Sequence, residues 1–132
     1  MKRPIILTTT LWMILWGCSK DTPDNVPPVQ ESEISISLIC PVNKAVIPFE
    51  ADTSLMVLMT DKMSLHEYTV RISNSKDSTL YYKEGHTHAA EFYFTDRFIN
   101  TALAGEKLDL VVQASNHKGE VLEKKFWFFS EN

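Results

Sequence analysis

Hydrophobic and polar residues alternate with a period of two through much of the chain beyond residue 33. Ile34, Ile36 and Leu38, for example, are separated by serines. Successive side chains of a β-strand point to opposite faces, so this alternation predicts strands with one buried face. The segments predicted as strands are 34–40, 53–60, 66–72, 79–82, 90–95, 108–115 and 121–129. Their number, length and spacing predict an all-β fold, a single antiparallel sandwich of about seven strands.

The stretch 96–104 departs from this period. Its apolar residues Phe98, Ile99, Ala102 and Leu103 stand at positions i, i+1, i+4 and i+5. That spacing predicts one helical turn. We expect this turn to carry the chain from one sheet to the other.

The first seventeen residues predict a signal peptide. Met1, Lys2 and Arg3 make a positively charged start, and the thirteen residues 4–16 carry no charge. As a helix, such a stretch would span only ~20 Å, too short for a hydrocarbon core of ~30 Å. A charged start before a short apolar stretch is typical of a secretory signal.

The sequence Leu15-Trp16-Gly17-Cys18 resembles the lipobox of bacterial lipoprotein precursors, with an aliphatic, a variable and a small residue before a cysteine. The resemblance implies cleavage before Cys18 and acylation of Cys18, and two or three acyl chains hold a protein firmly on a membrane. The residue after Cys18 is Ser19, whereas an aspartate at this position would resemble an inner-membrane retention signal. We therefore expect an outer-membrane lipoprotein and leave open which side its domain faces. An ordinary signal peptide and an uncleaved anchor are the alternatives.

Residues 18–32 predict a flexible tether. The segment contains three prolines and almost no apolar residues. It cannot bury enough surface to offset the entropy of ordering it. The expected organisation is a signal peptide (1–17), a lipidated cysteine with its tether (18–32) and a β-sandwich domain (33–132).

The net charge and the motifs absent from the sequence mainly exclude classes of function. The 132 residues include 13 Lys and Arg against 17 Asp and Glu, a net charge of −4, which becomes −6 without Lys2 and Arg3. Such a chain is not expected to bind nucleic acid. There is no glycine-rich phosphate loop, no G-x-S-x-G and no H-E-x-x-H motif, so we do not expect an enzyme.

Two segments resemble immunoglobulin-like and fibronectin type III modules. They are LICPVNKAVIPFEADTSLMVLMTD, with a proline turn between strands, and LDLVVQASNHKGEVLEKKFWF, with a polar hairpin before the last strand. The resemblance is to the small Ig-like domains of bacterial outer-membrane lipoproteins. It implies an Ig-like sandwich and by itself carries no function.

One cluster has metal-ligating residue types, namely His86, His88 and the nearby Glu91. Residues two apart on a strand share a face, so both imidazoles could reach one zinc or copper ion. Glu91 has the opposite parity and would need a bend to join them. His66 or His117 could supply a third ligand. The alternative is that these histidines are hydrogen-bonded at the rim of the sandwich.

Large aromatic residues suggest a recognition surface. On the last strand Trp127 has the opposite parity to the rings expected in the core, and Tyr81 and Tyr93 are also expected to face outward. Exposed rings stack on sugars or bind a protein partner. The alternative is that a loop or the first strand covers them.

These observations predict a lipid-anchored cell-envelope lipoprotein whose domain is a non-catalytic binding module. Its partners would be the membrane, through Cys18, and an envelope protein or a glycan. No cofactor is expected beyond the covalent lipid. The alternative function is binding of zinc or copper by the His-x-His cluster.

Overall fold

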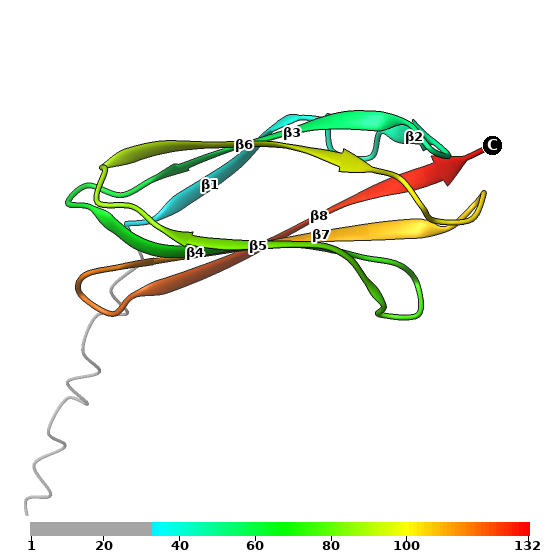
Figure 1. The fold of residues 1–132 in the computed structure, drawn as a ribbon. Coiled ribbons are helices and arrows are strands. Elements are labelled where there is room, and N and C mark those ends of the chain that lie inside the picture. The colour runs from blue at the N-terminus through cyan, green and yellow to red at the C-terminus, as the bar shows by residue number, and fades with distance from the viewer. Residues whose placement is uncertain (1–32) are drawn as a thin grey trace, which may run out of the picture.

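The computed structural model describes residues 33–132, so the predictions for the signal peptide, Cys18 and the tether lie outside the described part. Two sheets pack face to face (Figure 1). The strands are β1 (Ser35–Cys40), β2 (Val46–Pro48), β3 (Asp52–Thr60), β4 (Leu65–Ser73), β5 (Thr79–His86), β6 (Glu91–Ile99), β7 (Lys107–Asn116) and β8 (Val121–Glu131). One sheet has the order β1-β3-β6 and the other the order β2-β8-β7-β4-β5. Across residues 33–132 no helix has the length and hydrophobicity to span a membrane.

The predicted all-β sandwich is confirmed, with two corrections. Residues 33–132 form eight strands rather than seven, and the sandwich is not wholly antiparallel, because β2 runs parallel to β8. The three residues of β2 are too few to show an alternation in the sequence. Only Ile47 of this strand is buried, and it fills a core position at the edge of the five-stranded sheet.

The predicted helical turn at 96–104 is wrong, because this stretch is the end of a strand followed by a loop without a helical turn. Strand β6 continues to Ile99 and pairs with β3 over its whole length. Phe98 is 3% exposed and Ile99 is 58% exposed, which is the alternation of a strand. Ala102 is also buried, but from the loop that follows. The helix-like spacing therefore arose from the end of a strand joined to a loop.

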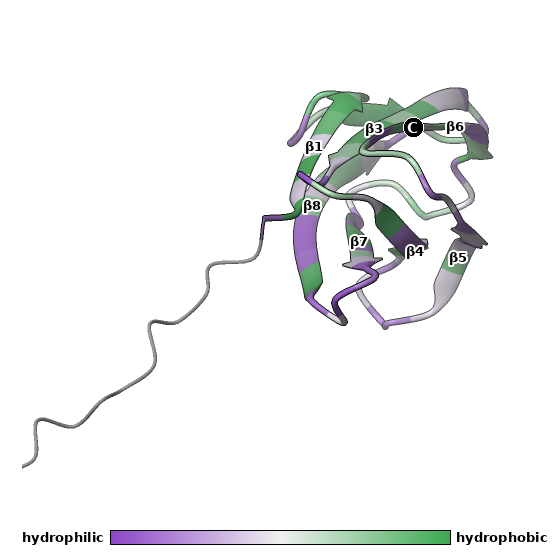
Figure 2. Cartoon of the chain, turned by 90° about the vertical axis from the view of Figure 1, so that its left-hand side faces the viewer, coloured by the Kyte–Doolittle hydropathy of each residue, from purple (hydrophilic) through white to green (hydrophobic). Residues whose placement is uncertain are grey.

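The core lies between the sheets, where Figure 2 shows the hydrophobic strand segments facing one another. Phe128, Val57, Val70 and Leu110 are completely buried. Alternate residues on each of these strands contribute to this layer. The predicted inward parity of the strands is thus confirmed for most positions.

The loops 61–64, 87–90 and 117–120 lie together at one end of the sandwich, here called the loop end (Figure 1). The described chain also begins there, because Glu33 accepts ion pairs from Lys62 at 3.3 Å and from Lys118 at 3.9 Å. The C-terminus lies at the opposite end.

Candidate metal centre

All four histidines of the chain lie at the loop end. His66 is the second residue of β4, His86 is the last residue of β5, His88 lies in loop 87–90 and His117 lies in loop 117–120. In an antiparallel arrangement, alternate loops fall at the same end of a sandwich. The topology therefore gathers side chains that are up to 51 residues apart in the sequence.

Three of these rings form a compact group. The rings of His66 and His117 have centroids 4.5 Å apart, and those of His88 and His117 are stacked at 5.1 Å with an interplanar angle of 8°. His88 Nδ1 and His117 Nε2 are 3.0 Å apart and share one hydrogen bond. One nitrogen from each of His66, His88 and His117 lies within 4.8 Å of the other two.

A second group contains a carboxylate. Glu67 Oε1 lies 3.7 Å from His86 Nδ1 and 3.9 Å from His66 Nε2. Both distances exceed those of a hydrogen bond, so the carboxylate approaches two imidazoles without being bonded to either. The three ligand atoms of this group are also within 4.8 Å of one another.

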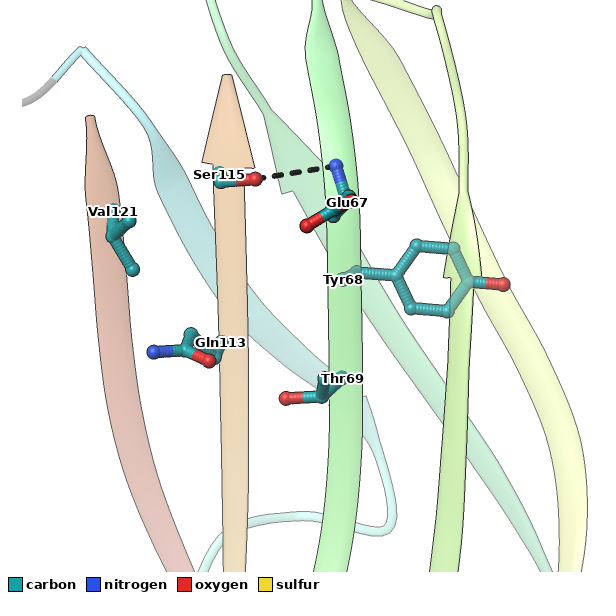
Figure 3. A pocket seen from close by; sticks show the side chains of 6 residues that line it. All are labelled: Glu67, Tyr68, Thr69, Gln113, Ser115 and Val121. Atoms are coloured by element: carbon teal, nitrogen blue, oxygen red, sulfur yellow. Dashed lines mark hydrogen bonds between the residues drawn. The ribbon is translucent and has the colours of Figure 1, made fainter. Parts of the chain in front are cut away.

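A β-bulge explains why His66 and its neighbour Glu67 both reach the cluster. The pairing of β4 with β7 aligns Leu65 with Asn116 but Tyr68 with Ala114, so β4 has one residue more in this stretch. A bulge re-aims side chains that would otherwise point to opposite faces. The bulged backbone is held by a hydrogen bond of 3.3 Å from the Glu67 N–H to Ser115 Oγ (Figure 3).

The loop that carries His117 is fixed by a buried polar network. Asn116 is 3% exposed, and its Oδ1 accepts hydrogen bonds from the N–H groups of Lys118 and Glu120. Its Nδ2 donates to Asp61 Oδ1 at 3.3 Å. Asp61 Oδ2 accepts in turn from the backbone of Met63 and Ser64 in loop 61–64. One network therefore orders two of the three loops at this end.

The segment that carries His88 is fixed by backbone hydrogen bonds. Thr87 N–H donates to the carbonyl of His66, and Leu65 N–H donates to the carbonyl of Ala89, both at 3.0 Å. These bonds place loop 87–90 beside the start of β4. The histidines thus stand on backbone whose geometry is set without any ligand.

The imidazole nitrogens, by contrast, are incompletely bonded. Among residues 33–132, His66 Nδ1 is the one buried side-chain nitrogen or oxygen without a hydrogen-bond partner. Two nitrogens that bind one tetrahedral zinc ion at 2.0–2.1 Å are about 3.3 Å apart. The 3.0 Å between His88 and His117 is close to this value, and an ion bound there would take the place of the proton that these two nitrogens share.

The structure places the three residues that the sequence singled out in different settings. His86 is grouped with His66 and Glu67, and His88 with His66 and His117, so the two do not share one ligand group. Glu91 belongs to neither group, because it starts β6 opposite Thr60 and is exposed. The carboxylate within reach of the imidazoles is that of Glu67. Sequence reasoning missed Glu67, since the bulge that turns it has no clear sequence signal.

The three aromatic residues singled out by sequence lie on different surfaces. Trp127 is half-buried on the outer face of the five-stranded sheet, with the Lys44 and Lys107 ammonium groups 5.6 and 5.7 Å from its ring. Tyr93 is 52% exposed on the outer face of the other sheet. Tyr81 points toward the edge of the core, where its ring contacts Phe98 edge-on. They do not form one platform.

The hydroxyl of Tyr81 makes a hydrogen bond that shifts the pKa values of both of its partners. The hydroxyl donates to Asp96 Oδ2 at 2.6 Å. Burial, followed by this bond to a carboxylate, raises the pKa of Tyr81 far above the usual value for a phenol. The same hydrogen bond is the largest cause that lowers the pKa of Asp96, with help from the Arg97 N–H and from Lys83.

No protein-family model matches the chain, and no curated protein matches it. Among solved structures, it is similar to fibronectin(III)-like modules of CbhA from Clostridium thermocellum, with a TM-score of 0.50 and 15% identity over 74% of this chain and 96% of that one. It is also similar to CopC from Methylosinus trichosporium OB3b, with a TM-score of 0.46 and 13% identity over 74% of this chain and 94% of that one.

The first of these similarities supports the sandwich fold. The described domain is a two-sheet β-sandwich whose fold is similar to that of fibronectin(III)-like modules. At such low identity the likeness concerns the fold alone, so function has to be argued from the side chains at the loop end.

Proposed function

We propose that domain 33–132 is a non-catalytic binding module whose ligand is a transition-metal ion held by His66, His88 and His117. One observation carries the proposal: a nitrogen from each of these three rings lies within 4.8 Å of the other two. The rings come from a strand and two separate loops, so chain proximity does not explain their meeting.

The chemistry of the ligands favours Zn²⁺ or Cu²⁺. Imidazole nitrogen is a preferred ligand of both ions. Neither group of candidate ligands contains a sulfur atom, which a site for Cu⁺ would favour. Three imidazoles leave a fourth position for water or for a group from a partner, as in open zinc sites.

The rigidity of the loops supports the same proposal. A site whose ligands are already held apart at nearly the right spacing loses little entropy when the ion binds. Asn116 and Asp61 hold the loop of His117, and the backbone of His66 holds the loop of His88. We expect binding without a change of fold.

Calorimetry on residues 18–132, with Cys18→Ser and no histidine tag, tests the proposal. Zn²⁺ should bind with a Kd of about 10⁻⁶ M or below. His66→Ala should weaken binding by about 30-fold or more, equivalent to ~2 kcal/mol. Glu91→Gln is the matched control, because its carboxylate is exposed outside the cluster. Equal affinity in all three proteins, or no binding by the parent, would contradict the proposal.

We also propose that the domain is anchored to the outer membrane through Cys18, as the lipobox resemblance implies. The described chain begins at the loop end, so a tether from Cys18 would join the domain on the side of the histidines. Fully extended, the tether would reach about 40 Å. A clickable fatty acid should label the parent protein but not Cys18→Ala, and equal labelling of both would refute acylation at this residue.

A glycan partner at Trp127 is the second candidate function. The half-buried ring borders a hollow of about 290 Å³ on the outer face of the five-stranded sheet, which Arg71 and Asp109 also line. An aromatic ring beside charged hydrogen-bonding groups is suited to a sugar. Binding of a glycan that survives His66→Ala and is lost in Trp127→Ala would favour this function over metal binding.

A further inference from the structure

We propose that the histidine cluster contains two overlapping coordination positions that share His66, and that one metal ion passes between them. This inference rests on the proposed function and deepens it from binding to transfer. The imidazole position consists of His66, His88 and His117. The carboxylate position consists of His66, Glu67 and His86.

Each position is complete enough to hold an ion. In the imidazole position, His88 Nδ1 and His117 Nε2 are 3.0 Å apart. In the carboxylate position, Glu67 Oε1 is 3.7 Å from His86 Nδ1 and 3.9 Å from His66 Nε2. Ligand atoms of one tetrahedral ion stand about 3.3 Å apart, so these three pairs are within about 0.6 Å of that spacing, and no pair in either set is more than 4.8 Å apart.

His66 is suited to serve both positions because neither of its ring nitrogens is engaged. Nδ1 is buried without a hydrogen-bond partner, and Nε2 is too far from Glu67 for a hydrogen bond. The ring also lies between the two sets, with centroid distances of 4.5 Å to His117 and 5.6 Å to His86. The bulge in β4 produces this placement, since it turns His66 and Glu67 toward the same end.

The two positions are expected to be occupied one at a time. Both need the imidazole of His66, and two divalent cations a few ångströms apart repel each other strongly. Glu67 is the one carboxylate in either ligand group, so the described site has little negative charge to offset a second ion. An ion that changes position exchanges His88 and His117 for Glu67 and His86, and it stays next to the His66 ring throughout.

The two positions open onto different surroundings. The imidazole position lies at the end of the sandwich, where two loops carry His88 and His117 beside the start of β4. The carboxylate position faces hollows on the outer face of the five-stranded sheet. One, of about 390 Å³, is lined by Glu84, Thr69 and His86. The other, on the β7 side of Glu67, is the one drawn in Figure 3. A partner that approaches this face would meet the ion at Glu67 and His86.

Titration with Cu²⁺ alone, followed by electron paramagnetic resonance, tests this arrangement on the tag-free chain with Cys18→Ser. The parent should bind one equivalent and give two overlapping spectra. His88→Ala combined with His117→Ala should leave only the spectrum of the carboxylate position. Glu67→Gln combined with His86→Ala should leave only that of the imidazole position. Because the binding constants of two mutually exclusive positions add, removal of one of two equally occupied positions should weaken binding only about 2-fold, whereas His66→Ala, which affects both, should lose about 100-fold or more.

The outcomes separate this inference from the function on which it rests. If the parent binds no metal, the proposed function itself is wrong. If Glu67→Gln with His86→Ala changes neither the spectrum nor the affinity, there is no carboxylate position, although metal binding stands. Uptake of two equivalents that both need His66 would overturn exchange of a single ion. Circular dichroism of each variant verifies that the fold is intact.

Discussion

The two ends of the sandwich differ in how completely their buried polar groups are hydrogen-bonded. At the end away from the histidines, here called the closed end, Asn100 and Ser130 are 0% and 3% exposed. Asn100 Nδ2 donates to the Ile47 carbonyl and to Ser130 Oγ, its Oδ1 accepts from the Ala102 N–H, and the Ser130 hydroxyl donates to the Ala102 carbonyl. At the loop end, Asn116 and Asp61 are bonded just as fully, but His66 beside them is not.

This difference separates structural from functional polar groups. A buried polar group normally has its hydrogen bonds, and an exception needs a reason. The closed end joins β2, β6 and β8, and its hydrogen bonds require no further partner. The loop end has a rigid frame that holds incompletely bonded imidazoles. That combination suits an external ligand, whereas the closed end suits stability alone.

The largest effect on folding should come from the closed end. Asn100→Ala removes the donor for Ile47 and Ser130 and leaves buried acceptors unpaired, so the free energy of unfolding should fall by about 3 kcal/mol. Urea unfolding followed by circular dichroism measures the loss, with the exposed neighbour Thr101→Ala as control. Zinc affinity should be unchanged. A variant that unfolds normally but loses zinc would break the distinction between the two ends.

The loop end should gain stability only from its ligand. Zinc at about 100 times its Kd should add about 2.7 kcal/mol to the free energy of unfolding. Addition of EDTA should remove the gain, and His66→Ala should not show it. Thermal unfolding with and without zinc measures both. A zinc-dependent gain that persists in His66→Ala would place the ion elsewhere on the chain.

Much of this arrangement could be predicted from sequence, for a physical reason. Seven of the strands bury one face, and a buried face imposes a period of two that is visible in the residues. The loop end itself follows from that prediction, because His66, His88 and His117 lie at or next to alternate connections between predicted strands. The short strand β2 was not predicted, because it buries a single side chain and so shows no alternation.

The carboxylate of the site could not be predicted in the same way. Parity alone places His66 and Glu67 on opposite faces, and the one extra residue of the bulge reverses that conclusion. Parity also separates Glu91 from His86 and His88, and the structure keeps it apart. The pattern of hydrophobic residues predicts at which end of the sandwich a side chain lies. Its neighbours at that end depend on local irregularities such as the β-bulge, which the pattern does not show.

Trp127 is an apolar side chain that is only half-buried, unlike the core rings of either end. Its ring packs edge-on against Phe129 and lies beneath Lys44 and Lys107. Trp127→Ala should therefore cost about 1.5 kcal/mol, between the ~3–5 kcal/mol of a core ring and the ~0.5 kcal/mol of an exposed one. Urea unfolding measures it, and Tyr93→Ala is the exposed control. A cost above ~3 kcal/mol would assign Trp127 to the core and remove the basis for the glycan site.

The smallest effect should come from a polar pair that is fully bonded but lies near the surface, Tyr81 with Asp96. Because the hydrogen bond lowers the pKa of Asp96 in the folded state, its contribution is present above the ordinary carboxyl pKa and is lost as the pH falls through the lower, folded value. Tyr81→Phe should cost about 1 kcal/mol at pH 7, since partial exposure of Asp96 screens the bond, and progressively less below about pH 4. The pKa of Asp96, followed by NMR, should rise in the variant.

Tyr82→Phe is the matched control, because the Tyr82 hydroxyl donates to Glu84 on the exposed side of the same strand. This substitution should leave the free energy of unfolding unchanged. A cost that stays constant down to pH 2 would mean that Tyr81 stabilises the domain by packing against Phe98 and not through the charge of Asp96.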